Sequence, residues 1–231
     1  MSSFVHDRIV FGRQDYAIAA LSGGKLFNPL EWGFVTRPIS QSFGYHCQYM
    51  VEDGRLVMDY AEVYDRSGKF PDINGVSGKL EEPHDMACYN GNFNWSVEHD
   101  YQDTRFRVYD NIGLKIQYTG KILAGWDLKM ELFEDLGYQK PYAYTEVIEL
   151  YFEEGKLVKA IDRSRAAESV RNMIYQGQFL EMDPEMPQDE YIRKCFSLDY
   201  KDKAAWLSEF EVYEEEILFP QKERMEEDES A

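Results

Sequence analysis

A two-residue alternation of apolar and polar side chains constrains the fold of this chain more than any other feature. Between residues 114 and 124, one parity is apolar at Leu114, Ile116, Tyr118, Ile122 and Ala124, and the other is largely polar. Successive side chains of a strand leave opposite faces of the sheet, so this period predicts a strand with one buried face. Similar alternation recurs at Tyr45–Val51, Leu56–Tyr64 and Tyr142–Phe152. The sequence therefore predicts a mainly β protein.

One segment between two of these strands changes period. Leu128, Leu132 and Leu136 recur at helical spacing with charged residues between them. Asp127 suits an N-cap, and Gly137 suits the position just after a helix end. The pattern predicts a helix at 127–136. A helix this short is unstable alone in water, so we expect it to cover the sheet.

The order of elements predicts an α+β chain dominated by one sheet. Strands at hairpin spacing favour an antiparallel β domain over residues 1–162, barrel-like or strongly curved, with the inserted helix at 127–136. Residues 163–219 form a predicted helical segment that packs on this domain. Residues 220–231 are predicted to be an acidic, flexible tail.

Two turns of the chain echo one another. Glu52–Val57 reads Glu-Asp-Gly-Arg-Leu-Val, and Glu153–Val158 reads Glu-Glu-Gly-Lys-Leu-Val. Each is followed by an Asp-Arg-Ser tripeptide, at Asp65–Ser67 and Asp162–Ser164. A duplicated half would explain the echo, as would convergent hairpin chemistry, which we favour because such residues suit tight turns in general.

Composition and charge limit the classes of function. The net charge of −18 argues against nucleic acid as a ligand, because that binding needs clustered cations. Residues 181–231 hold 17 acidic against 6 basic residues, which suits either solubility or a basic partner. No apolar run is long enough for a membrane span, and the first residues lack a secretory signal pattern. With three cysteines and no paired spacing, we expect a cytoplasmic protein with reduced thiols.

Two carboxylates lie on the apolar parity of their predicted strands. Glu62 shares its parity with Met58 and Tyr60, and Glu146 shares its parity with Tyr144 and Ile148. A carboxylate facing a barrel interior would be desolvated and could act as a general acid or base. The alternative is that each lies near a strand end, where its face has already reached water.

Aromatic residues could line a ligand pocket beside these carboxylates. Rings with a polar edge suit binding surfaces, although core packing is the default role in an aromatic-rich β domain. Trp32, Trp126 and Tyr142 are further rings of this kind. The predicted ligand-binding set is Tyr60, Glu62, Trp95, Tyr118, Tyr144 and Glu146.

No motif in the sequence indicates a metal or a cofactor. His84 and Cys88 lie four residues apart, but two ligands are too few for a structural zinc site. The segment Ser22–Lys25 lacks the spacing of a phosphate-binding loop. We therefore expect no metal and no cofactor.

Three functional hypotheses remain. The first is a non-catalytic cytosolic binding protein that holds a small apolar or aromatic ligand in the β-barrel interior, or engages a basic protein through its acidic surface, as an inhibitor or immunity-type protein would. The second is an enzyme that uses Glu62 and Glu146 for acid–base catalysis. The third is a homo-oligomer assembled through an apolar helical stripe, which consists of Trp206, Phe210, Tyr213 and Ile217.

Overall fold

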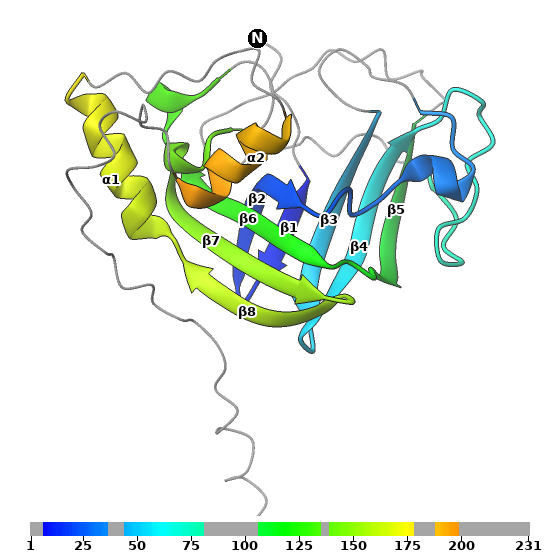
Figure 1. Cartoon of the computed structure of the whole chain (residues 1–231). Helices are drawn as coiled ribbons and strands as arrows, with labels where there is room; N and C mark the ends of the chain where they lie inside the picture. The colour runs from blue at the N-terminus through cyan, green and yellow to red at the C-terminus, as the bar shows by residue number, and fades with distance from the viewer. Residues whose placement is uncertain (1–6, 37–43, 81–105, 135–138, 178–187, 199–231) are drawn as a thin grey trace, which may run out of the picture.

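The computed structural model describes residues 7–36, 44–80, 106–134, 139–177 and 188–198, and its main feature is one eight-stranded sheet curved into an irregular ring (Figure 1). The strands are β1 (Arg8–Phe11), β2 (Gln14–Ser22), β3 (Tyr45–Glu52), β4 (Arg55–Tyr64), β5 (Phe106–Lys115), β6 (Gly120–Leu128), β7 (Tyr144–Glu153) and β8 (Lys156–Asp162). The other elements are the helices α1 (Ser164–Tyr175) and α2 (Gln188–Ser197) and the 3-10 turns η1 (Pro29–Trp32), η3 (Met130–Leu132) and η4 (Pro141–Ala143). The predicted mainly β, strongly curved architecture is confirmed.

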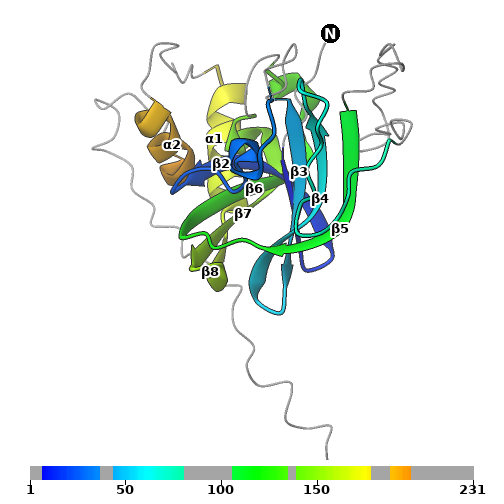
Figure 2. The same cartoon turned by 90° about the vertical axis from the view of Figure 1, so that its right-hand side faces the viewer.

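The ring closes through seven of the eight strands. The strand order is β3-β1-β2-β6-β7-β8-β4-β5, and β3 also pairs with β4, so only β5 lies outside the closed circuit. Figure 2 shows β5 running beside β4. Among the described strands, β1 and β3 form the one parallel pair, which departs from the antiparallel sheet that we expected.

The two echoing turns meet where β4 joins β8. Leu56 N donates to Gly155 O, and Leu157 N donates to Gly54 O, each at 2.8 Å. Both glycines have positive φ, 68° at Gly54 and 77° at Gly155, as tight hairpins require. The Asp-Arg-Ser tripeptides also match, because Asp65 Oδ1 and Asp162 Oδ1 each accept the N–H two residues later at 2.8 Å. The sequence echo thus marks the closing contact of the ring.

Apolar side chains are buried on both sides of the sheet. Every strand contributes to the interior cluster, which includes the fully buried Ile9, Tyr49, Met58, Ile122 and Ile148. An outer cluster lies between β2, β6 and β7 on one side and α1 and α2 on the other. Both faces of these three strands are therefore buried, so parity alone does not identify the interior there.

The helix predicted at 127–136 is wrong in the described part of that segment. Strand β6 continues to Leu128, and only the single turn η3 follows. Asp127 does not cap a helix: it adopts a φ of +58°, and its carboxylate accepts a hydrogen bond from the Thr145 hydroxyl at 2.7 Å. Lys129 N donates to Ala143 O at 2.7 Å, which keeps the chain beside η4. The cross-strand bonds outweigh a helical preference that is weak in so short a segment.

Two helices follow the sheet in the described part of the chain. Helix α1 matches the helix predicted from residue 163, and its buried Arg171 ties it to the sheet by donating to Tyr142 O at 3.1 Å and to Tyr144 O. Helix α2 contacts β2. The predicted apolar stripe at residues 206–217 and the predicted tail at 220–231 lie outside the described residues. In the described part of the chain, no helix has the length and apolarity that crossing a membrane requires.

Candidate functional site

One end of the ring interior carries polar groups, and we call it the mouth: Tyr16, Trp126, Glu146 and Asp162. The strand register places three of them side by side, because Ala17 pairs with Gly125 and Trp126 pairs with Glu146. Asp162 comes from the adjacent strand, where it pairs with Ile148. Among the described residues, an apolar cluster fills most of the rest of the interior, so these four residues form a chemically distinct part of it.

Glu146 is held by a phenol. The Tyr16 hydroxyl donates a hydrogen bond to Glu146 Oε1. Tyr16 is only 4% exposed, whereas Glu146 is half-buried and reaches the surface. Burial raises the pKa of Tyr16 above its ordinary value, and the bond to Glu146 and the charge of Asp162 raise it further. Tyr16 therefore stays a neutral donor, and the carboxylate is oriented without being neutralised.

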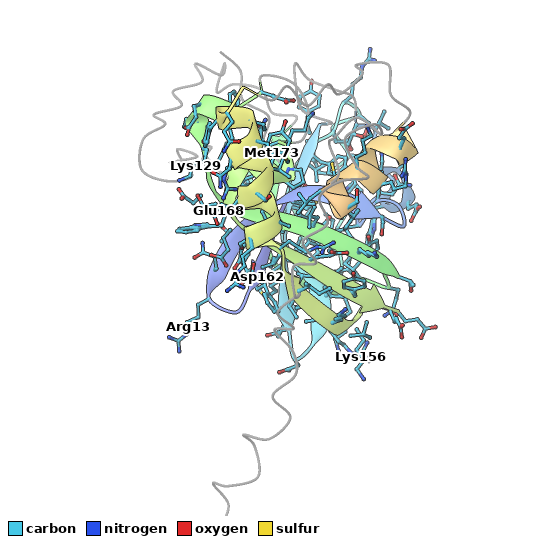
Figure 3. All side chains as sticks on the ribbon, turned by 60° about the vertical axis from the view of Figure 1, so that its left-hand side comes forward. Arg13, Lys129, Lys156, Asp162, Glu168 and Met173 are labelled. Carbon is cyan, nitrogen blue, oxygen red and sulfur yellow. The ribbon has the colours of Figure 1, made fainter. Side chains whose placement is uncertain are left out.

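Asp162 and Trp126 complete the mouth. Asp162 Oδ1 accepts the Ser164 N–H at 2.8 Å, which leaves Oδ2 without a hydrogen bond from the described residues. Figure 3 shows Asp162 where β8 passes into α1. Trp126 is half-buried and packs against the interior cluster. An indole beside two carboxylates is a surface that attracts a cation, since the ring face and the carboxylates are both negative.

The two carboxylates have no cationic partner in the described part of the chain. No lysine, arginine or histidine there lies within 4.0 Å of the Glu146 or Asp162 carboxylate. Glu149, on the other face of β7, shows the contrast, because Arg163 Nε at 2.9 Å and Lys121 Nζ at 3.4 Å pair with it. Among the described residues, no cation compensates the carboxylates of the mouth.

Glu62 does not join this site, and its predicted interior position is wrong. The register of β4 shifts between Met58 and Tyr60. After this shift Ala61 and Val63 face the interior cluster, and Tyr60 and Glu62 face outward. A bulge of this kind inserts one residue and reverses the faces that follow it. Glu62 is half-buried on the outer face, where its carboxylate accepts a hydrogen bond from the Tyr60 hydroxyl at 2.6 Å.

The predicted aromatic residues have separate positions. Tyr118 is a core residue whose hydroxyl lies 2.9 Å from both Ser22 O and Lys121 O. Tyr144 belongs to the outer cluster beneath α1, which corrects its predicted place beside Glu146. Tyr60 lies with Glu62 on the outer face, and Trp95 is outside the described residues.

Sequence reasoning missed Tyr16 and Asp162. Tyr16 shares its parity with the buried Ile18, and Asp162 shares its parity with Ala160. Alternation in β2 and β8 therefore indicates an interior position for both side chains. Carboxylates on an apolar parity were considered only in the strands of Glu62 and Glu146, so this indication was not used. Trp126 was among the expected pocket-lining aromatics.

Within the described ranges, no group of three or more His, Cys, Asp or Glu side chains could hold a metal ion. Cys47 and Cys195 are both buried, and no disulfide joins them to each other. Burial raises the pKa of the Cys47 thiol well above its ordinary value, so the reactive thiolate form is suppressed.

Comparison with known proteins assigns no function to this chain, so a functional proposal depends on the geometry of the site. No protein-family model, no curated protein and no solved structure gives a significant match to this chain.

Proposed function

We propose that the protein is a non-catalytic binding protein that holds a positively charged group, an amine or a guanidinium, at the mouth of its ring. The observation that carries the proposal is the pair of carboxylates, Glu146 beside Trp126 and Asp162 on the next strand, with no cation from the described residues. A bound cation would compensate the charge that the fold leaves uncompensated. The net charge of −18 would steer such a ligand toward the protein from a distance.

The ligand is a small cation or a basic side chain of a protein partner, and both use the same chemistry. Fully buried side chains such as Tyr49 and Ile148 occupy the middle of the ring, so the mouth is a better place for a ligand than the ring centre. The odd number of cysteines, three without paired spacing, supports a reducing compartment such as the cytoplasm.

Acid–base catalysis by Glu62 and Glu146 has less support. The bulge in β4 turns Glu62 outward, whereas Glu146 faces the interior, so the two carboxylates cannot flank one substrate in this fold. Assembly through Trp206, Phe210, Tyr213 and Ile217 stays a prediction, because those residues lie outside the described ranges.

An NMR titration of the full chain with benzylamine tests the proposal. We expect the Trp126 indole N–H resonance to shift with benzylamine and to stay unchanged with benzyl alcohol, which has the same ring but no charge. Glu146→Gln and Asp162→Asn should each weaken binding about tenfold or more, as expected for loss of a charge-assisted contact.

Glu62→Gln is the matched control. It removes the same charge from a glutamate that also accepts a tyrosine hydroxyl, but on the outer face. Equal weakening by Glu62→Gln and Glu146→Gln would show that binding depends on overall charge and not on the mouth. The absence of any Trp126 shift at millimolar benzylamine would contradict the proposal directly.

A further inference from the structure

The ring has a short seam between β1 and β3. The two strands run parallel and share three residue pairs, Arg8 with Gln48, Ile9 with Tyr49 and Val10 with Met50. By contrast, β3 and β4 share eight pairs. The β1–β2 junction is also short, with four pairs. Because each pair contributes hydrogen bonds and packing, the β1–β3 junction opens more readily than the long β3–β4 junction.

Asp7 fastens one end of this seam. Its Oδ1 atom accepts the Cys47 N–H of β3 at 2.8 Å. Its backbone carbonyl accepts the Ile18 N–H of β2 at 2.9 Å. One residue therefore ties the start of β1 to the strand on each side of it.

The surroundings of Asp7 disfavour a charge. Its side chain is 17% exposed, and the titratable groups of the described residues that face it come from β3: His46, with Nδ1 3.9 Å from Oδ1, and the buried Cys47 and Tyr49. β2 offers it only the Ile18 backbone. No lysine or arginine of the described residues pairs with it. Burial raises the pKa of Asp7 from 3.8 to about 7, against the opposing effect of the Cys47 N–H bond.

The seam is connected to the mouth through one row of interior side chains. Tyr49 of β3 pairs with Ile9 of β1, and Ile9 pairs with Tyr16 of β2. Tyr16 in turn holds Glu146. Movement of β1 away from β3 would therefore separate Ile9, the partner of Tyr16, from Tyr49.

We propose that the β1–β3 seam is a proton-controlled fastening, closed while Asp7 is protonated and loosened when Asp7 ionises. Protonated Asp7 fits a buried site in which no lysine or arginine of the described residues pairs with the carboxylate, and an ionised Asp7 gains hydration only if the seam opens. This behaviour belongs to the fold itself and does not require a ligand at the mouth.

The sign of the pH dependence follows from the direction of the pKa change. The closed seam holds Asp7 at a pKa of about 7, whereas the open seam returns it toward 3.8. The stabilising effect of the proton is complete below the lower value and is lost as the pH rises through the higher one. Between about pH 5 and pH 7 the opening constant should rise about tenfold per pH unit, and above that it should level off.

Amide hydrogen exchange of the full chain measures this opening. After correction for intrinsic exchange rates, we expect the protection of the Cys47 amide to fall about tenfold per pH unit in that window. In Asp7→Asn the protection should be independent of pH, because the asparagine keeps an acceptor oxygen and cannot ionise. Asp53→Asn removes an exposed carboxylate from the β3–β4 turn and should behave as the unmodified protein does.

Two further measurements cover the case in which His46 is the titrating group and the case in which Asp7→Asn does not fold. If His46→Gln abolishes the pH dependence and Asp7→Asn retains it, the imidazole is the sensor and the proposal is overturned. If Asp7→Asn does not fold, the carboxyl carbon of Asp7 is titrated in the unmodified chain by NMR. A midpoint near 7 supports the proposal, and a midpoint below about 5 overturns it.

Discussion

Replacing Gly155 with alanine should destabilise the protein far more than the same replacement at Gly54. The two glycines occupy equivalent positions in the echoing turns, with similar positive φ values of 77° and 68°. The carbonyl oxygen of each accepts a hydrogen bond from a backbone N–H of the other turn. Their surroundings differ, because a Cβ atom at Gly54 would meet nothing within 4 Å, whereas one at Gly155 would lie under 3.0 Å from Ile116 O.

The expected cost follows from two contributions. A Cβ atom at positive φ costs roughly 1–2 kcal/mol at either position. At Gly155 the Ile116 oxygen must also move. Two hydrogen bonds hold these segments in place and resist the movement: Ile116 N donates to Leu56 O at 3.0 Å, and Gly155 N donates to Tyr118 O at 2.8 Å. Overpacking of this kind costs about 1–3 kcal/mol, and a lost hydrogen bond about 1 kcal/mol more. We expect a loss of about 3–5 kcal/mol for Gly155→Ala and about 1–2 kcal/mol for Gly54→Ala.

Equilibrium urea denaturation at pH 7 provides the comparison. Both variants leave the number of charges unchanged, so the difference between them reports the contact with Ile116. Losses that agree within about 0.5 kcal/mol would refute the reasoning, because the close approach of the two turns would then carry no energetic weight.

Two further substitutions test contacts elsewhere in the fold. Burial raises the pKa of Asp65, but N–H and O–H donors led by Ser67 outweigh it and lower the pKa below 3.8. Asp65→Asn should therefore cost about 2 kcal/mol at pH 7 in urea denaturation, and the loss should shrink as the pH falls through the lowered folded value. Arg171→Met should cost about 2–4 kcal/mol and weaken amide protection in α1, because Tyr142 O loses a charged donor; the exposed Arg165→Met should change little.

The sequence was most informative where one face of a strand is exposed or where a turn has demanding backbone angles. Alternation around Ile122 correctly predicts a strand with a buried face, and the Gly54 and Gly155 turns lie where their sequences predict hairpins. It was least informative at 127–136, where a helical spacing of leucines competes with the bond from Thr145 to Asp127. Local propensity is worth less there than contacts with residues distant in sequence.

For the candidate site, alternation identified Glu146 correctly and Glu62 wrongly. Both glutamates share the apolar parity of their strands, and both accept a hydrogen bond from a tyrosine hydroxyl. Only the register shift between Met58 and Tyr60 separates them, because it reverses the faces of the second half of β4. No residue type in that stretch marks the shift, since a bulge arises from pairing with neighbouring strands.

The sequence alone determined that this chain makes strands, where its tight turns fall and that its net charge is negative. These properties depend on side-chain period, on φ preference and on composition, all of which are local. The tertiary structure decided which face is the interior, that β4 meets β8 through two similar turns, and that Tyr16, Glu146 and Asp162 share one mouth. Those outcomes depend on pairing between strands far apart in the chain, which a period of two residues cannot encode.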